Sequence, residues 1–487
     1  MRKNSRVCIP RTRIVTRALF LAGFLAALGW AQSNSESNRR DLTRPPEFES
    51  DTLKHAEISR ATPSLKEIRK RGLEVFATPF TAAIGYGDGP PKLFDPGYPT
   101  LPGRRPTLQD NGMFLRVNGL DSQTCLECHS VQSSLTVPFT FGVGGVGFAS
   151  SNVLFQPTVI DVADSRFNGF AAFNGRFINP PFLFGSGGVE LLAKEMTAEL
   201  QALKRRALTE QGPVQLIAKG VHFGYVQTQG GALDTSNVHG VDEDLVVRPF
   251  GRKGEFATVR EFDIEAMQFH FGMQPVEVVG RSIDDDADGI SDEVSEGDLS
   301  ALSIFVTHLE RPVTARLRSD ERAGEVRFQA LGCAGCHVPV LHTSSPILTY
   351  SFPEVASDPS ANVYYQADLQ SQRPGFDPSP QGGIKVPLFS DLKRHDMGPG
   401  LAESFGASLD RWFITARLWG VADTAPYLHD GRAHTLEEAI MLHGGEAQAV
   451  RDAYSEQPEE AKRELIAYLM TLRTPAEPAS DLVGQKE

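Results

Sequence analysis

The sequence predicts a chain of two related regions, each opened and closed by a helix. A C-x-x-C-H pattern occurs once in each region, at residues 125–129 and at residues 333–337. Related short segments open the two regions, RGLEVF at residues 71–76 and AGEVRF at residues 323–328. We interpret these pairs as a weak internal repeat with a large insertion in the first copy.

The opening helix of the first region is predicted from residue 64 onward. Ser64 and Glu67 form a capping-box pattern. The apolar positions that follow at helical spacing are Leu65, Ile68, Leu73 and Phe76. A stretch rich in Gly and Pro, residues 78–112, then separates this helix from the first C-x-x-C-H motif. In the second region the opening helix runs almost directly into the motif.

Each region also closes with a predicted helix. The apolar faces of the two closing helices are Leu299, Leu302, Phe305, Val306 and Leu309 in the first, and Leu465, Tyr468, Leu469 and Leu472 in the second. Pro312 and Pro475 follow them. We therefore expect two domains, residues 32–312 and 313–487. Residues 200–280 have no counterpart in the second region, and we interpret them as an elaboration of the first.

The composition excludes two classes of protein. The 487 residues are 40% hydrophobic and 22% charged, which argues against whole-chain disorder and against a multi-span membrane protein. The formal net charge is −13, and no basic stretch is long enough to follow a nucleic-acid backbone. We therefore expect no nucleic acid among the partners.

Residues 1–31 have the pattern of a secretory signal. Six Lys and Arg residues precede an apolar run at residues 18–28, and Gly29 and Ala31 offer small residues for cleavage. An uncleaved anchor helix is the alternative, but the run is short for a full membrane span. We expect a soluble mature protein in the periplasm, with no membrane segment left after cleavage.

The four cysteines outside the signal point to c-type haem. Cys125 and Cys128 are followed by His129, and Cys333 and Cys336 by His337. In C-x-x-C-H the two thiols attach to one haem, and the His becomes the proximal iron ligand. An exported chain first suggests disulfides, but neither a disulfide, a zinc site nor a redox C-x-x-C needs a His after each pair. We predict two covalently bound haems.

Two stretches of the second region make the chain similar to the bacterial di-haem cytochrome c peroxidases. They are RHDMGPGLA at residues 394–402 and the LWG, TAPYLHDGR and LHGGEA segments within residues 418–447. More narrowly, the chain resembles the di-haem oxidoreductase (peroxidase) family, whose superfamily includes the MauG-type enzymes. The likeness is looser before residue 310, where residues 180–192 carry it. It implies a mainly α fold of two cytochrome c-like haem domains, the first with long irregular insertions.

The distal ligand of the second haem has two candidates. Thr435 and Glu438 form a capping box, and His443 falls on the apolar face of the helix predicted there. A satisfied core histidine is the ordinary reading of such a residue. The resemblance implies that this position supplies the distal ligand, commonly as Met. Met397 is the competing candidate, and a His/Met pair would favour a higher potential than His/His.

Glu190 is the candidate for proton transfer at the first haem. It lies in an apolar, glycine-rich segment, where burial would raise its pKa. The alternative is a Glu at a helix start that interacts with the helix dipole. His222, His239 and His270 are candidates for a distal ligand on this side.

The resemblance also implies a Trp between the two haems. The matching residues look like FNGR at 173–176, so Phe173 takes its place, which argues against storing an oxidising equivalent there. Trp412 and Trp419 lie in the second region, and we interpret both as core packing near the haem.

Residues 284–293 (DDDADGISDE) start like a calcium-binding loop. Asp284, Asp286 and Asp288 have the D-x-D-x-D-G spacing, but Ser295 stands where a bidentate Glu is expected, and Glu296 comes one place late. A variant Ca²⁺ loop and a solvated acidic turn both remain open.

These features lead to one expected function and two alternatives. A small donor protein, a cytochrome c or a cupredoxin, would deliver electrons to the C-terminal haem, and the N-terminal haem would reduce hydrogen peroxide. The motifs alone support only haem and electron transfer. The alternatives are a non-catalytic electron-transfer protein, and an oxygenase or MauG-like enzyme that oxidises a small organic or a protein substrate. Residues 78–112 and 200–280 leave room for such a substrate.

Overall fold

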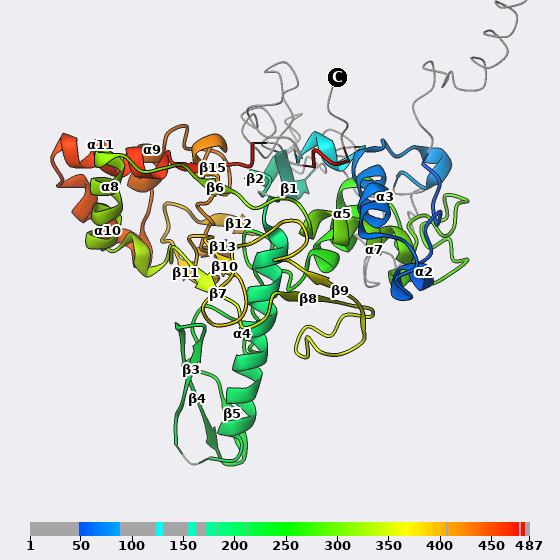
Figure 1. Cartoon of the computed structure of the whole chain (residues 1–487), viewed down its shortest axis with the longest axis horizontal. Helices are drawn as coiled ribbons and strands as arrows, with labels where there is room; N and C mark the ends of the chain where they lie inside the picture. Colours follow the sequence, from blue (N-terminus) through cyan, green and yellow to red (C-terminus); the bar gives the residue numbers. More distant parts are fainter. Residues whose placement is uncertain are drawn as a thin grey trace, which may run out of the picture. The chain divides into compact units, whose positions relative to one another are not determined.

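A computed structural model of the chain describes residues 48–87, 123–129, 154–161, 172–181, 183–210, 212–405, 408–476 and 479–482. The predicted signal and most of the predicted insertion at residues 78–112 lie outside this part of the chain. The described residues are mostly helical, with small sheets: six sheets of two strands and one of three (Figure 1). The mainly α class is therefore confirmed, while the division into two haem domains stays a prediction.

The helices of the first half precede residue 313. They are α2 (His55–Ser59), α3 (Leu65–Ala77), η2 (Ala82–Ile84), η4 (Cys125–Glu127), α4 (Ser186–Ala207), α5 (Val259–Phe271), α6 (Val276–Val279) and α7 (Glu296–Thr307). The helices of the second half are α8 (Ser319–Ala330), η7 (Cys333–Gly335), η8 (Val421–Asp423), α9 (Leu436–Met441), η9 (Gly445–Ala447), α10 (Gln448–Ser455) and α11 (Glu459–Leu469).

The strands pair antiparallel throughout the described residues. In the first half they are β1 (Leu154–Asp161), β2 (Ala172–Ile178), β3 (Val214–Ala218), β4 (Val221–Gln229) and β5 (Ala232–Asp234). From residue 313 they are β6 (Val313–Thr314), β7 (Leu341–His342), β8 (Ile347–Ser351), β9 (Val363–Asp368), β10 (Lys385–Val386), β11 (Arg394–Asp396), β12 (Glu403–Phe405), β13 (Ser408–Asp410), β14 (Trp412–Ile414) and β15 (Leu472–Arg473).

The predicted helix pair of the first region is present. The Ser64–Glu67 capping box starts α3, and α3 packs on α7. Gly72 permits the close approach, because a Cβ there would lie 2.2 Å from the carbonyl oxygen of Ala301. The predicted apolar face of α7 is buried, from Leu299 to Val306.

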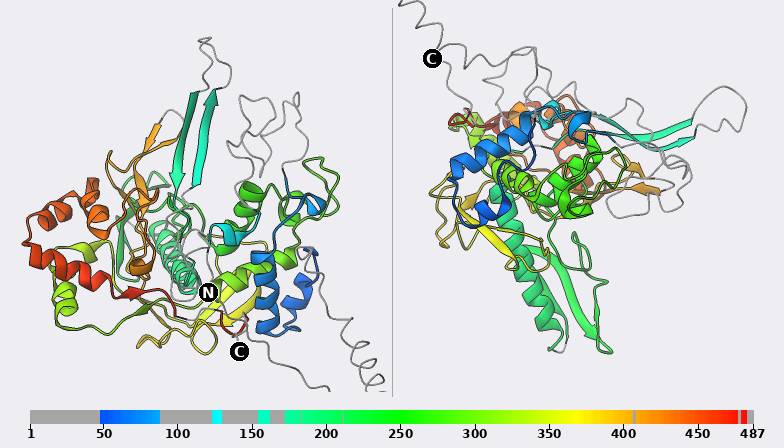
Figure 2. Two further views of the ribbon diagram at one scale, coloured as in Figure 1. Left: turned by 90° about the horizontal axis from the view of Figure 1, so that it is seen from above. Right: turned by 90° about the vertical axis from the view of Figure 1, so that its right-hand side faces the viewer.

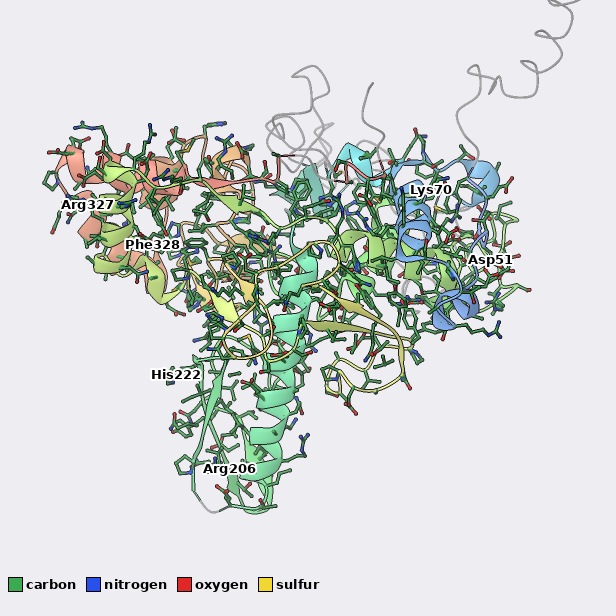
Figure 3. The ribbon with its side chains drawn as sticks, in the orientation of Figure 1. Asp51, Lys70, Arg206, His222, Arg327 and Phe328 are labelled. Carbon is green, nitrogen blue, oxygen red and sulfur yellow. The ribbon has the colours of Figure 1, made fainter. Side chains whose placement is uncertain are left out.

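The same arrangement recurs in the second region. Helix α8 packs on α11, and a Cβ at Gly324 would lie 2.0 Å from the carbonyl oxygen of Glu464. Phe328, labelled on α8 in Figure 3, packs edge-on against Tyr468 with ring centres 5.7 Å apart. Gly72 and Gly324 occupy matching positions of the two opening segments, so the proposed repeat has the same structural basis in both halves.

Helix α4 and the β3–β4–β5 sheet form the elaboration of the first region. The sheet packs along α4, as the views in Figure 2 show. Residues 200–280 therefore hold the end of α4, three strands, α5 and α6. The expectation of irregular insertions is wrong for this segment, because alternating burial along β3 gives it one face on the helix.

The buried side chains form two cores. The larger core joins α3, α4, α5 and α7 to residues after 313, including Leu341, Leu348 and Trp419. The smaller core lies among α8, α9, α10 and α11, around Phe328, Tyr454 and Leu465. Trp419 is buried as predicted, but Trp412 is 46% exposed on the edge strand β14, so its interpretation as core packing is wrong.

None of the helices in the described part of the chain is both long enough and apolar enough to cross a membrane.

Candidate functional site

The two C-x-x-C-H motifs have the same local structure. Each pair of cysteines begins with a short 3-10 turn, η4 or η7. The backbone N–H of His129 donates to the carbonyl of Cys125 at 2.8 Å, and that of His337 to the carbonyl of Cys333 at 3.0 Å. These turns hold both cysteines and the His at one place, as attachment of a single haem requires.

The cysteine side chains fit attachment better than redox chemistry or zinc binding. All four are free of disulfides. Burial raises the pKa of Cys125, helped by Asp263, and burial raises that of Cys333 to about 11. Thiols in such surroundings are neutral, whereas redox and zinc sites need thiolates. Among the described residues the two pairs do not meet in one metal-binding group.

The second motif faces another imidazole. The rings of His337 and His443 have their centres 6.4 Å apart and are tilted by 58°. Two imidazoles that bind one metal ion from opposite sides, each at about 2 Å, have ring centres about 6 Å apart. Burial, followed by the nearby His443, lowers the pKa of His337 to about 4, and burial lowers that of His443. Both rings are therefore neutral, as iron ligands must be.

Backbone carbonyls orient both of these rings. His337 Nδ1 lies 3.2 Å from the carbonyl oxygen of Phe389 and 3.1 Å from that of Ala416. His443 Nδ1 lies 2.7 Å from the carbonyl oxygen of Ala439. A ring that donates through Nδ1 presents Nε2 as the free donor atom for a metal.

The position of His443 differs from the prediction in one respect. The Thr435–Glu438 capping box is present, but α9 ends at Met441, so His443 follows the helix rather than lying on it. The backbone of Met397, the competing candidate, is held by other residues. Its N–H donates to the carbonyl of Arg411, and its carbonyl lies near Gly444. The ring geometry fits a second imidazole ligand at His443, and the choice between His443 and Met397 stays a prediction.

The signature residues of the second half surround this motif. His395 lies between Asp391, 2.9 Å from its Nε2, and Glu446, 2.7 Å from its Nδ1. Burial opposes its charge, but hydrogen bonds to Asp391, Cys336 and Glu446 outweigh burial and raise the pKa of His395 to about 11. A charged His395 thus ties the segment at residues 394–398 to the second cysteine pair.

The first motif has different surroundings. Burial, with a smaller contribution from His270, lowers the pKa of His129 to about 4, and its Nδ1 is buried without a hydrogen-bond partner. His270 lies in the last turn of α5. Because its charge contributes to the lowered pKa of His129, this candidate lies near the first motif. His222 and His239 are exposed on and beside strand β4 (Figure 3), and the structure does not bring them to the motif.

Glu190 is buried in α4, as predicted, with 3% of its surface exposed. Its Oε1 lies 2.9 Å from Nζ of Lys194, and its Oε2 accepts a hydrogen bond from the backbone N–H of Val259 at 2.9 Å. Val259 is the first residue of α5, so Glu190 caps the helix that carries His270. Its helix-dipole interaction is therefore with α5 rather than with its own helix.

Three glycines near Glu190 let α4 approach its neighbours. Gly185 has a φ of 79° at the start of α4 and lies against Trp419. A Cβ at Gly187 would lie 2.3 Å from the carbonyl oxygen of Thr307, and one at Gly188 would lie 2.5 Å from the ring of Phe376. The glycine-rich segment thus serves close packing that buries Glu190.

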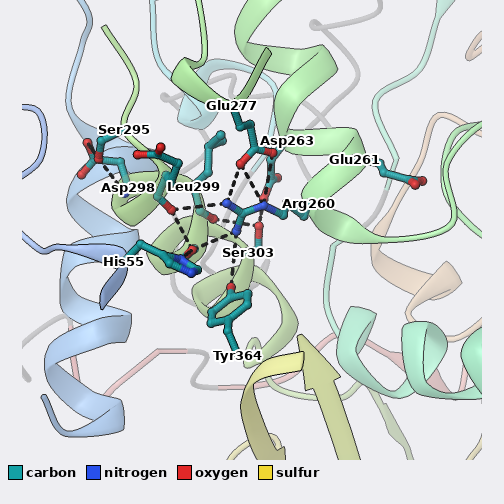
Figure 4. Close-up of polar contacts among 12 residues, drawn as sticks. His55, Arg260, Glu261, Asp263, Glu277, Ser295, Asp298, Leu299, Ser303 and Tyr364 are labelled. Carbon is teal, nitrogen blue, oxygen red and sulfur yellow. Dashed lines mark hydrogen bonds and ion pairs between the residues drawn. The ribbon is translucent and has the colours of Figure 1, made fainter. Parts of the chain in front are cut away.

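Glu190 lines a small polar cavity together with residues that the sequence did not single out. The other lining residues are Arg260, Ser303, Tyr350, Ser351, Glu354 and Tyr364. Arg260 donates to Glu277 at 2.6 Å, to Ser300 at 2.9 Å and to Tyr364 at 3.3 Å (Figure 4). Burial raises the pKa of Glu354 to about 7, although Lys194 opposes the shift.

Asp263 connects this cavity with the first cysteine pair. Its carboxylate accepts a hydrogen bond from Ser303 at 2.7 Å, and its charge contributes to the raised pKa of Cys125. Burial raises the pKa of Asp263 well above its usual range. The sequence did not identify Asp263 and Arg260 as site residues, since the residue pattern of a short helix does not reveal that both side chains are buried.

A second cluster of carboxylates forms at the predicted acidic loop. One oxygen from each of Asp284, Asp286 and Asp288 lies within 4.8 Å of the others. Ser295, at the position of the missing bidentate Glu, caps α7 instead, and Glu296 pairs with Arg281 at 2.6 Å.

Asn179 in the first half forms hydrogen bonds with the backbone at residues 426–429 in the second half. Its side-chain amide donates to the carbonyls of Pro426 at 2.8 Å and Leu428 at 3.0 Å, and its backbone N–H donates to His429 at 2.7 Å. Pro181, two residues on, has its backbone against His129. Phe173 lies on β2. Its side chain is outside the described part of the structure, so its role in place of the expected Trp stays a prediction.

The residues present fit two covalently attached haems. His129 offers a buried neutral imidazole with an unpartnered nitrogen, and His337 faces His443 at the spacing of an axial pair. The chemistry of the donor set, two thiols and one imidazole at each turn, agrees with this assignment.

No curated protein matches the chain. A solved structure of Kuenenia stuttgartiensis hydrazine synthase is 12% identical, with a TM-score of 0.33 over 95% of this chain and 100% of that one. A MauG-like protein associated with microbial copper homeostasis is 13% identical, with a TM-score of 0.26 over 59% of this chain and 89% of that one.

A family model matches residues 379–472, the part of the second half that contains His395 and His443. That family is described as "Di-haem oxidoreductase, putative peroxidase". The resemblance of this chain to the di-haem oxidoreductase family is thereby confirmed.

Proposed function

We propose that the chain is an exported, periplasmic di-haem c oxidoreductase that reduces hydrogen peroxide to water. The reaction consumes one peroxide, two electrons and two protons and releases two waters. A small donor protein of the cytochrome c or cupredoxin type supplies the electrons through the C-terminal haem. The observation that carries the proposal is the difference between the two motifs: His337 faces His443, whereas Cys125 of the first motif experiences the charge of Asp263, which belongs to a buried network of acids.

Each covalently bound haem supplies a redox-active iron when present. His129 and His337 would each bind a haem iron, and His443 would be the second protein ligand at the C-terminal haem. The carbonyls of Phe389, Ala416 and Ala439 hold the two facing rings in place. An iron with two protein ligands suits electron transfer, because it has no free position for a substrate.

The acids near the first motif are suited to hold protons. Asp263 and Glu354 both have raised pKa values because of burial, so a proton can reside on their carboxyl oxygens near neutral pH. Glu190 stands between Lys194 and the N-terminus of α5 and lines the same cavity. We propose that Glu190 and Asp263 move the protons that peroxide reduction requires.

Stopped-flow absorption of the fully reduced protein, mixed anaerobically with hydrogen peroxide, tests this proposal. We expect reoxidation of both haems with one peroxide per two electrons. Glu190→Gln and Asp263→Asn should each slow reoxidation about 100-fold, with unchanged haem spectra in the resting protein. Glu210→Gln is the matched control, since Glu210 follows the end of α4 and pairs with the exposed Arg206 at 2.7 Å. Slow reoxidation of the wild type contradicts peroxide reduction.

A second function is favoured by the position of His270 near His129. If His270 binds the first iron, both haems are closed and the protein transfers electrons without catalysis. Electron paramagnetic resonance separates the cases: peroxide reduction predicts an open, high-spin haem in the active form, and electron transfer predicts two low-spin haems. His443→Ala should convert the second haem to high spin, while Met397→Leu should leave it unchanged.

A further inference from the structure

The acidic loop at residues 284–293 contains two buried carboxylates. Asp286 and Glu293 are each only 3% exposed. Oδ2 of Asp286 and Oε1 of Glu293 are both buried without a hydrogen-bond partner. Buried oxygens of this kind are costly unless a donor or a cation compensates them.

Glu293 is fixed in place from two sides. Its Oε2 accepts a hydrogen bond from the backbone N–H of Gln274 at 2.7 Å. Its side chain lies against Gly85, where a Cβ would come within 2.3 Å of the Glu293 carboxyl carbon. Since Gly85 has a φ of 93°, both its conformation and the contact require glycine. These contacts fix the carboxylate of Glu293 in place, while its Oε1 has no hydrogen-bond partner.

The three aspartates are presented by a tight turn. Asp284 accepts hydrogen bonds from the backbone N–H groups of Asp288, at 3.1 Å, and Gly289, at 3.0 Å. Asp288 accepts one from Ile290 at 2.7 Å. This turn brings one oxygen of each aspartate within 4.8 Å of the other two.

Like charges act on one another across this cluster. Burial, together with Asp288 and Asp284, raises the pKa of Asp286 to about 7. Burial raises the pKa of Glu293 to about 9, and Asp286, Asp288 and Asp284 all contribute to the shift. Glu293 therefore experiences the charges of the three aspartates, while the oxygens within 4.8 Å of one another belong to Asp284, Asp286 and Asp288.

We propose that this group binds one Ca²⁺ ion through Asp284, Asp286, Asp288 and Glu293. Carboxylate oxygens in a flexible loop are the ligands that Ca²⁺ prefers, whereas Mg²⁺ requires a stricter octahedral set and keeps more waters. Glu293 replaces the bidentate Glu that the loop lacks at Ser295. The bound ion compensates the two unpartnered oxygens.

The site connects three separate segments. Gly85 ends the turn at residues 82–84, Gln274 follows α5, and Val294 pairs with Pro275 just before α7. Calcium therefore stabilises the packing of α5 and α7, the helices that carry His270, Asp263 and Ser303. This stabilisation does not depend on whether the haems react with peroxide.

Calorimetric titration of the haem-loaded, EGTA-treated full chain with CaCl₂ tests the site. We expect one ion per chain, a dissociation constant below about 1 mM, and a melting temperature that rises with Ca²⁺. Glu293→Gln and Asp288→Asn should each weaken binding by at least about tenfold, because each removes a ligand charge. Asp285→Asn removes a charge from the same loop but no ligand, and should bind Ca²⁺ like the wild type.

Three outcomes would overturn the site. They are the absence of binding to the wild type, an equal effect of Mg²⁺ and Ca²⁺ on the melting temperature, and equal losses in Asp285→Asn and Asp288→Asn. Asp288 is partly exposed, so Asp288→Asn keeps the test valid if Glu293→Gln fails to fold.

Discussion

The two haem-attachment regions share a frame and differ in what surrounds it. In both, an opening helix crosses a closing helix at a glycine and leads to a 3-10 turn that carries the cysteines. Around His337 the neighbours are a second imidazole and backbone carbonyls. In the first motif, Cys125 experiences the charge of Asp263, which belongs to a buried polar network with Arg260 and Glu190.

The contrast between the two regions separates the requirements of haem attachment from those of proton transfer. The frame that binds a haem needs only packing and a local turn, so it can be repeated with little change. Proton transfer needs buried titratable groups, and these come from α4, α5 and β9, outside the frame. Both halves of the chain thus contribute the buried groups that the frame lacks.

Removing Lys194 should have the largest effect, because it is the cation that pairs with both Glu190 and Glu354. Its Nζ lies 2.9 Å from Glu190 and 3.7 Å from Glu354, and 7% of its side chain is exposed. Lys194→Met leaves two buried acids uncompensated, so the free energy of unfolding should fall by about 4 kcal/mol. Urea unfolding measures the change.

The second region supplies the control for this comparison. Lys462 pairs with the exposed Glu459 at 3.0 Å. Lys462→Met should cost less than about 1 kcal/mol. Equal losses in the two variants would show that the first region has no special polar centre.

The pH dependence of stability sharpens the comparison further. Glu354 is titrated near pH 7 in the folded protein, and its side chain is 9% exposed. A raised acid pKa stabilises the fold below the unfolded pKa of about 4.3, and this contribution is lost as the pH rises through about 7. The difference amounts to about 4 kcal/mol.

Unfolding midpoints in urea between pH 4 and 8 test this expectation. Glu354→Gln should flatten the fall in stability over that range, and Glu210→Gln should not. A profile of Glu354→Gln that matches the wild type would contradict the assignment.

Gly72→Ala and Gly324→Ala should have smaller and similar effects, because the frame is shared. Each added methyl group meets a carbonyl of the facing helix, so each variant should lose about 2 kcal/mol. Helix propensity alone would give a gain of about 1 kcal/mol, so the sign of the change is decisive. Val326→Ala, on the exposed side of α8, is the control. Thermal unfolding of the three variants provides the measurement.

The parts of the fold that depend on local sequence could be predicted. The capping boxes at Ser64 and Thr435, the apolar face of α7 and the presence of an opening and a closing helix in each region follow from spacing along the chain. The exposure of Trp412 could not be predicted, because it depends on an edge strand formed with residues 394–396.

The candidate site was predictable to a similar extent. The attachment residues follow from the motif, and the burial of Glu190 follows from its apolar, glycine-rich segment. Lys194, one helical turn after Glu190, was a usable signal for its partner. Arg260, Asp263 and Glu354 acquire their meaning only when separate elements pack together. Glu293 lies inside the acidic loop, but at a position that the standard calcium pattern does not use.

The contacts of Asn179 have a consequence for how the chain folds. Its amide joins residues 247 and 249 positions apart, and the larger core contains side chains from both halves. Closing so long a loop is slow relative to local helix formation. We therefore expect that the N-terminal half cannot complete its native structure on the ribosome, as independent domains do, and that folding waits until about residue 430 has been synthesised.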